Sequence, residues 1–199
     1  MTDPTSVVPE AALDAIGAIA HRPAGDPAGV LLLTHGAGGN RDSPLLVHLC
    51  DEWAGRGWLA LRYNLPYRRR RPKGPPSGSA TADRAGVAEA IAAARALSGG
   101  PLIVGGHSYG GRLTSMVVAD GAEADGLRLF SYPLHPPGKP DRLRIEHFGS
   151  IRTPTVFTHG TRDPFGTIDE LRAAARLIPA PVEIVEITGA RHDLAPIYR

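Results

Sequence analysis

Ser108 lies at the centre of the pentapeptide GHSYG, between an apolar run and a helix-like stretch. A Gly-x-Ser-x-Gly pattern in that setting is typical of a nucleophile elbow, a tight turn that exposes the serine Oγ. The residues two positions before and after the serine must be small, and Gly106 and Gly110 meet that requirement. The N–H of Tyr109, at the start of the following helix, is placed to stabilise a developing oxyanion. A glycine-rich turn that only packs a helix against a sheet fits the same pattern, so other residues must decide.

Asp163 and His192 are the side chains that complete a catalytic triad with Ser108. Asp163 comes after the apolar run 154–159, and His192 comes after the last apolar run, 182–187. In a parallel α/β sheet, reactive side chains lie on loops at the carboxyl ends of the strands. The order serine, aspartate, histidine along the chain is the order that accompanies such an elbow. We therefore expect the three side chains to meet at one edge of a sheet.

Each of these side chains has a chemical role. A serine hydroxyl is a weak nucleophile near neutral pH, so it needs a base, and His192 is a suitable one. Asp163 accepts a hydrogen bond from the other ring nitrogen and fixes the tautomer. Alternatives remain, because Asp163 could simply begin a turn and His192 could be one of several surface histidines. Asp193 competes as the acid, but adjacent residues rarely orient each other's side chains in this way.

A second oxyanion donor is expected from the glycine-rich loop at 35–39, which follows the first buried strand. Glycines allow the backbone of such a loop to approach a ligand closely. The N–H of Ala37 is the preferred donor, and that of Gly38 is the alternative. A phosphate-binding loop is the rival interpretation. It fails because no Gly-Lys-Ser/Thr follows and the third glycine of a dinucleotide fingerprint would fall on Arg41.

Apolar runs that alternate with helical patterns predict a mostly parallel sheet covered by helices on both faces. The whole chain, 1–199, is expected to form a single α/β domain, with residues 1–14 as a loose N-terminal arm. Residues 15–20 fit a weak edge strand or a helix, and the proline-rich segment 64–79 is expected to be a loop. The predicted strands are 29–34, 58–63, 102–104, 127–132, 154–159 and 182–187, and the predicted helices are 43–56, 80–97, 112–119 and 168–177.

The composition is that of an ordinary globular protein. The chain has 199 residues, 42% of them hydrophobic and 21% charged, and a net charge of +2. Its single cysteine, Cys50, excludes an intramolecular disulfide and fits a reducing compartment. The N-terminus lacks a signal-peptide pattern and no apolar run could span a bilayer, so a cytoplasmic location is expected. No cluster of potential ligands has metal-binding spacing, so neither a metal nor an organic cofactor is expected.

The sequence resembles the α/β-hydrolase superfamily from about residue 30 onward. Within it, the chain is similar to a group of small members without a cap domain, often described as dienelactone-hydrolase-like. Three stretches carry the similarity: LTHGAGG at 33–39, YPLHPPGKP at 132–140 and GTRDPFG at 160–166. The resemblance implies a three-layer α/β-hydrolase fold.

Two departures from the relatives matter. True dienelactone hydrolases use cysteine as the nucleophile, where this chain has Ser108. Relatives in the small group often carry Lys-Ser-Met, where this chain has His107, Ser108 and Tyr109. Some relatives are non-enzymatic subunits of larger assemblies, which leaves a binding or scaffold role as the alternative to catalysis.

The expected substrate is a small or exposed acyl ester, because the segment between residues 132 and 149 is too short to form a cap. In that segment, Leu134 is expected to line the pocket together with Tyr109, and His135 to add a polar contact; a rigid structural loop is the alternative. Four consecutive arginines at 68–71 suggest an anionic partner or a solvated loop. Nucleic acid is not expected, because no aromatic residues interleave with them as a stacking platform. Nothing indicates the oligomeric state. The leading hypothesis is a serine esterase or thioesterase that works through an acyl-enzyme.

Overall fold

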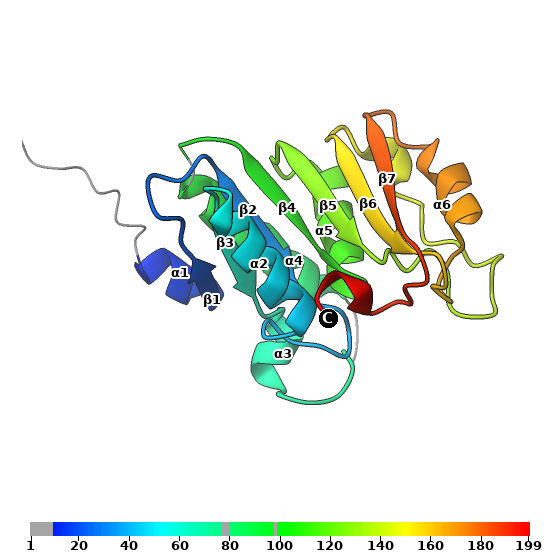
Figure 1. Cartoon of the computed structure of the whole chain (residues 1–199), viewed down its shortest axis with the longest axis horizontal. Coiled ribbons are helices and arrows are strands. Elements are labelled where there is room, and N and C mark those ends of the chain that lie inside the picture. Colours follow the sequence, from blue (N-terminus) through cyan, green and yellow to red (C-terminus); the bar gives the residue numbers. More distant parts are fainter. Residues whose placement is uncertain (1–9, 77–79, 98) are drawn as a thin grey trace, which may run out of the picture.

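The structure, a computed structural model, describes residues 10–76, 80–97 and 99–199, which form a seven-stranded sheet flanked by helices (Figure 1). The strand order is β1-β3-β2-β4-β5-β6-β7, and only β1 runs antiparallel to its neighbour. The strands are β1 (Ala18–His21), β2 (Val30–Thr34), β3 (Leu59–Tyr63), β4 (Leu102–His107), β5 (Gly126–Phe130), β6 (Thr155–Gly160) and β7 (Val182–Ile187).

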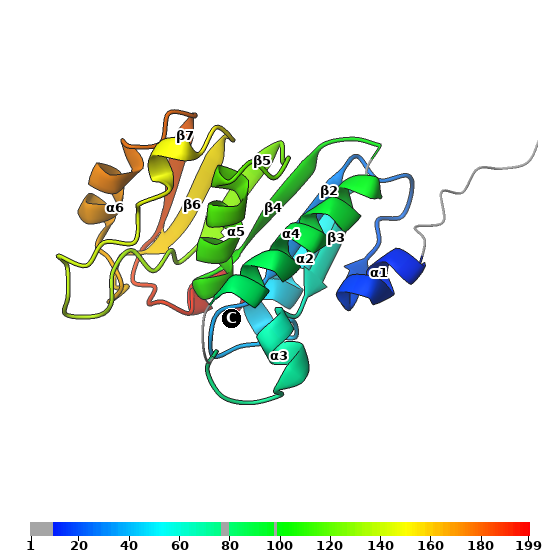
Figure 2. The ribbon, with the colours of Figure 1, turned by 180° about the vertical axis from the view of Figure 1, so that it is seen from behind.

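Helices cover both faces of this sheet. In Figure 1, α2 lies in front of β2 and β3, and Figure 2 shows α4 and α5 on the opposite face. None of the helices in the described ranges is long and apolar enough to cross a bilayer. The helices are α1 (Glu10–Ile16), α2 (Pro44–Gly55), α3 (Pro66–Arg70), α4 (Thr81–Ala96), α5 (Tyr109–Ala119) and α6 (Ile168–Ala175), with short 3₁₀ turns η1 (Phe148–Ser150) and η2 (Ala195–Ile197).

The core explains why the central strands read as continuous apolar runs. All five residues of β2 are buried, because alternate side chains enter different hydrophobic clusters. Leu31 and Leu33 pack with the buried side of α2, whereas Val30 and Leu32 pack with α4 and α5. The predicted fold class, an α/β sheet with helices on both faces, is confirmed.

Two segments differ from the prediction. The segment 15–20, expected to be either an edge strand or a helix, contains the end of α1 at Ile16 and the start of β1 at Ala18. The expected loop at 64–79 contains α3, which starts with Pro66 at a position where proline's fixed φ favours a helix. The Tyr67 N–H donates to the buried carboxylate of Asp83 at 2.9 Å, so a tertiary contact stabilises a helix too short for sequence patterns to reveal. Of the expected arm 1–14, residues 1–9 lie outside the described residues and the rest begin α1.

No inserted domain separates β5 from β6 in the described chain, where η1 is the only helical element of the connection. Hydrogen bonds between residues of this connection fix its shape. Tyr132 donates its hydroxyl proton to the carbonyl of Arg144 at 2.6 Å, and the Arg144 N–H donates to the carbonyl of Leu134. The carboxyl ends of the central strands are therefore not covered by a cap.

Candidate active site

Ser108 occupies a sharp turn between β4 and α5. Its backbone has φ +50° and ψ −116°, a strained conformation for a residue with a side chain, and its N–H donates to the carbonyl of Phe130. The glycines on either side are required by contact. A Cβ on Gly106 would lie 2.5 Å from the carbonyl oxygen of Thr34, and one on Gly110 would lie 2.5 Å from that of His35. The turn therefore has the tight geometry that the pentapeptide predicts.

We expect Gly106→Ala to lower the free energy of unfolding by about 1–3 kcal/mol, because the new methyl group meets backbone atoms that cannot rotate away. Urea unfolding measures the effect. Gly55→Ala is the matched control: no atom lies within 4 Å of a Cβ there, so its stability should be unchanged or higher. Equal stability of the two variants would contradict the steric account of the elbow.

His192 lies between Ser108 and Asp163. Its Nε2 is 2.8 Å from the Ser108 Oγ, and its Nδ1 is 2.8 Å and 3.0 Å from the two carboxylate oxygens of Asp163. The Asp163 side chain is fully buried and also accepts the Phe165 N–H at 2.9 Å. Burial raises the pKa of Asp163, but the hydrogen bond and charge of His192 and the Phe165 N–H outweigh burial, so the pKa lies below its usual value. The carboxylate is thus ionised and the Nδ1–H donates to it, which leaves Nε2 to accept the serine proton.

Two neighbours that the sequence analysis did not assign hold His192 in place. The Nε2–H of His107 donates to the backbone carbonyl of His192 at 2.7 Å. Burial lowers the pKa of His107 to about 4, so this ring is a neutral donor near pH 7. The ring of Phe165 lies against the His192 imidazole with centroids 4.2 Å apart. Of these two residues, only His107 could have been suspected from the sequence, because it lies within the elbow itself.

Hydrogen bonds to a backbone carbonyl group fix the shape of the loop that follows β2. The Gly36 carbonyl accepts the Nδ1–H of His35 at 2.8 Å and the N–H of Gly39 at 3.0 Å. In a trans peptide the N–H points away from the carbonyl, so the Ala37 N–H faces the side opposite these donors. Among the described residues, no hydrogen bond satisfies the N–H of Ala37 or that of Tyr109. Both N–H groups are therefore available to a ligand.

These donor-bearing segments adjoin the serine. Gly36 packs on Ser108 so closely that a Cβ on the glycine would lie 3.3 Å from the serine Cβ. Tyr109 is the next residue in the chain and the first of α5, whose initial N–H groups have no partner within the helix. The arrangement can therefore stabilise negative charge on an oxygen bound beside Ser108.

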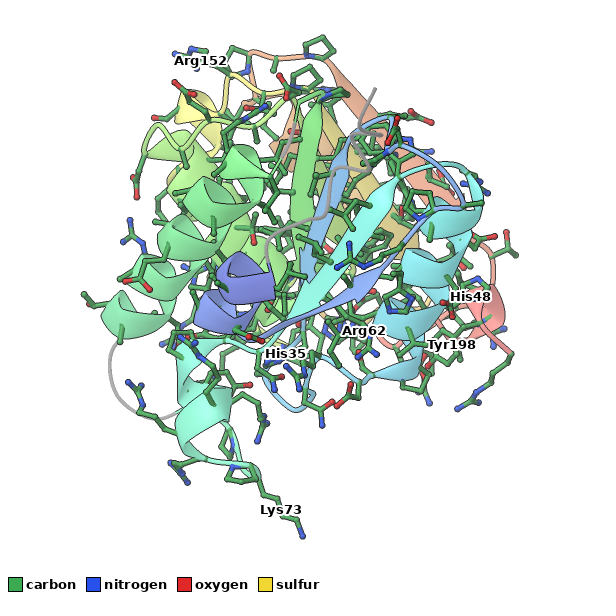
Figure 3. All side chains as sticks on the ribbon, turned by 90° about the vertical axis from the view of Figure 1, so that its left-hand side faces the viewer. His35, His48, Arg62, Lys73, Arg152 and Tyr198 are labelled. Atoms are coloured by element: carbon green, nitrogen blue, oxygen red, sulfur yellow. The ribbon has the colours of Figure 1, made fainter. Side chains whose placement is uncertain are left out.

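His35 is a buried neutral histidine beneath this loop, visible at the lower edge of the sheet in Figure 3. Its Nε2 accepts the N–H of Leu65, which requires an unprotonated nitrogen. Burial lowers the pKa of His35 to about 4 from an ordinary 6.5. The unfolded chain therefore binds a proton at this site more readily than the folded chain does.

Because the folded pKa of His35 is depressed, its stabilising effect is complete above pH 6.5 and is lost as the pH falls toward 4. We expect this site to lower the free energy of unfolding by about 3 kcal/mol across that window. Urea unfolding at pH 7.5 and pH 4 would measure it in the wild type and in His35→Asn, whose amide does not titrate there. An identical pH dependence in both proteins would refute the assignment.

A cavity of about 400 Å³ opens beside Ser108. The loop at 36–39, called the oxyanion loop below, forms one side of it together with Ser108 and His192, and the start of α2 and the C-terminal segment form the other. Figure 3 shows Tyr198, of the latter segment, on the same side of the molecule as α2. The lining residues share an open, mainly apolar surface with a few polar groups: Gly36, Ala37, Gly38, Gly39, Ser43, Pro44, Leu45, His107, Ser108, Phe165, His192, Asp193 and Tyr198.

Leu134 and His135, expected at the substrate, are not part of that lining. Leu134 is fully buried and packs against Gly166. His135 is also buried, and its ring bonds to the Pro136 carbonyl and to Glu170. The connection that carries both is folded on itself, which corresponds to the alternative of a rigid structural loop. The Tyr109 side chain also points elsewhere, since its hydroxyl donates to Asp83 at 3.1 Å.

The structure also shows where Asp193, the competing candidate for the triad acid, and the four arginines at 68–71 lie. Asp193 is exposed and its carboxylate accepts the Ala195 N–H, a turn contact separate from the His192 ring. Among the four arginines, Arg68 is buried while Arg69 and Arg70 are exposed. No group of three or more His, Cys, Asp or Glu side chains suited to a metal ion occurs in the described residues.

A mostly parallel sheet with a serine-bearing elbow after its central strand is the architecture of the α/β hydrolases. A family described as "Alpha/beta hydrolase domain" has a sequence model that matches residues 27–199, and the chain belongs to this family. Membership marks the chain as an enzyme of the hydrolase class.

Solved structures share the fold. An α/β serine hydrolase homologue from Coxiella burnetii superposes with a TM-score of 0.73 at 18% identity, covering 91% of this chain and 85% of that one. A dienelactone hydrolase from Anabaena variabilis gives 0.68 at 18% identity, covering 89% and 82%. Est1E from Butyrivibrio proteoclasticus, with ferulic acid bound, gives 0.74 at 14% identity, covering 89% and 87%.

Proposed function

We propose that the chain is a serine hydrolase of the esterase or thioesterase type, which cleaves a small or exposed acyl ester through an acyl-enzyme. The observation that carries the proposal is the continuous contact from the Ser108 Oγ through His192 to the ionised carboxylate of Asp163. The order of these groups lets the serine lose its proton as its oxygen attacks, while the imidazolium that forms is stabilised by the carboxylate.

The proposed reaction has two halves. The Ser108 oxygen bonds to the acyl carbon as its proton passes to the His192 Nε2, and the carbonyl oxygen becomes an oxyanion facing the N–H groups of Ala37 and Tyr109. The tetrahedral intermediate collapses, and His192 returns the proton to the departing alcohol or thiol. Water then gives a proton to His192 and attacks the acyl-enzyme, releasing the acid and restoring Ser108.

The size and openness of the cavity support a small acyl substrate. A cavity of about 400 Å³ at the low end of small-molecule sites suits a short or aromatic acyl group. Est1E binds an aromatic acid, ferulic acid, in the same fold, which is consistent with this choice. The buried, unpaired thiol of Cys50 fits a protein that works in the reducing cytoplasm.

p-Nitrophenyl esters of graded acyl length, with an acyl-coenzyme A beside them, test this function. We expect hydrolysis of short acyl esters to exceed that of long ones. Labelling by a fluorophosphonate probe separates the enzyme from a binding or scaffold protein of the same fold. A folded protein that neither hydrolyses any of these esters nor takes up the probe would reject the proposal.

A further inference from the structure

Arg68 is a buried cation that bonds to backbone carbonyls. Its Nε donates to the Gly39 carbonyl at 2.7 Å and its Nη2 reaches the Ala37 carbonyl at 3.4 Å, both in the oxyanion loop. The rest of the guanidinium donates to the carbonyls of Arg71 and Gly74. No carboxylate within the described residues forms an ion pair with it. Lys73, a few residues along, projects into solvent (Figure 3). Burying a charge is costly unless the charge is hydrogen-bonded, so we expect these four carbonyl contacts to hold the guanidinium and the oxyanion loop in one arrangement.

Tyr67 holds the same loop from the same side. Its hydroxyl donates to the Ala37 carbonyl at 2.7 Å. Its ring packs edge-on against His35 and Tyr109, and the Arg68 guanidinium lies 5.0 Å from the ring centroid. The same hydroxyl lies 3.4 Å from the Gly36 carbonyl, so the carbonyls of Gly36 and Ala37 are bonded on the side away from the cavity. The N–H groups of the same two peptides, those of Ala37 and Gly38, are left facing the cavity.

Asp83, at the start of α4, joins this clamp to the second donor segment. It is only 3% exposed, and one carboxylate oxygen accepts the Tyr67 N–H at 2.9 Å. Its other oxygen accepts the Tyr109 hydroxyl at 3.1 Å. One buried carboxylate therefore connects α3, which holds Ala37, with Tyr109, whose own N–H is the other oxyanion donor.

We propose that Tyr67, Arg68 and Asp83 form a bracket that fixes the distance between the two oxyanion donors, and that they are positioning residues for ester hydrolysis. The inference rests on the function proposed above. None of the three lines the cavity, so they act through Ala37 and Tyr109 and not on the substrate. The first arginine of the run thus has a role inside the fold instead of binding an anionic partner.

Tyr67→Phe is the sharpest variant, because it removes one hydroxyl and keeps the ring that packs on His35 and Tyr109. We expect kcat to fall on the order of tenfold, part of the 10²–10³ that loss of a whole oxyanion donor costs. KM should stay within about twofold and the pH profile of kcat should keep its shape, because neither the cavity nor the triad is changed.

Tyr132→Phe is the matched control. It removes a buried hydroxyl that bonds to the Arg144 carbonyl, away from the oxyanion loop. Both variants should lower the unfolding midpoint to a similar extent, but only Tyr67→Phe should lower kcat. Equal kcat values in the two variants, with the wild type active, would overturn the bracket and leave the proposed function standing.

The amide resonances of Ala37 and Gly38 give a readout that needs no activity. In ¹H–¹⁵N spectra, Arg68→Met should shift both amides, whereas Arg70→Met, at an exposed arginine of the same run, should leave them in place. Unmoved amides in Arg68→Met would reject the bracket directly. A wild type with no hydrolysis and no probe labelling would instead reject the proposed function, and the catalytic role of the bracket with it.

Discussion

Ser108→Ala is expected to lower kcat by on the order of 10⁵-fold, the largest effect of any single substitution in this chain. The alanine keeps the elbow but removes the oxygen that bonds to the acyl carbon. His192→Ala should cost about as much, and the double variant little more, because the two groups act as one unit. Steady-state kinetics with a short p-nitrophenyl ester measure all three.

The activity that remains in Ser108→Ala measures the contribution of the two oxyanion donors. The N–H groups of Ala37 and Tyr109 remain in Ser108→Ala, so catalysis about 10³-fold over water should persist. Near-normal turnover in His192→Ala would show that another group is the base. The fold of each variant is checked by its unfolding midpoint, which should not fall steeply, because Ser108→Ala removes a single oxygen and His192 is only half-buried.

Asp163→Asn is the second large effect, with kcat expected to fall about 10³–10⁴-fold. The asparagine can still accept the Phe165 N–H that Asp163 accepts at 2.9 Å, so the loop should keep its shape. Its NH₂ group, however, donates to the His192 Nδ1 and moves the ring proton to Nε2, which then cannot accept the serine proton. The negative charge that stabilises the imidazolium is lost as well.

Asp193→Asn is the control for this experiment, because Asp193 is the adjacent carboxylate and bonds to the Ala195 N–H. Because Asp193 lines the cavity but forms no hydrogen bond with the His192 ring, its replacement should change KM more than kcat, and kcat should fall far less than in Asp163→Asn. A reversal, with Asp193→Asn inactive and Asp163→Asn active, would exchange the two assignments.

The positions of the central strands and of the elbow could be predicted from the sequence, because they depend on short runs of neighbouring residues. Four buried apolar residues followed by a buried threonine in β2, and the glycines at 106 and 110, leave few alternatives for strand and elbow. The α/β fold class and the kinship with α/β hydrolases are confirmed on this basis. Ser108, Asp163 and His192 each come just after a parallel strand, which places them at one edge of the sheet, and the loops after β6 and β7 bring the side chains together.

The parts that could not be predicted depend on tertiary contacts. The helix α3 is five residues long, and its buried arginine is indistinguishable in sequence from the exposed arginines that follow. Leu134 and His135 follow a strand at the correct edge, yet the hydrogen bonds of their own connection turn them into the core. No spacing rule reveals which face of a proline-rich loop points inward.

The central claim is that the Ser108 Oγ is the nucleophile, and the site of covalent modification tests it most directly. The protein would be treated with a fluorophosphonate probe, digested, and the adduct located by tandem mass spectrometry. We predict one adduct, on Ser108, which is absent from Ser108→Ala and strongly slowed in His192→Ala. An adduct on another residue, or equal labelling of the wild type and Ser108→Ala, would contradict the account.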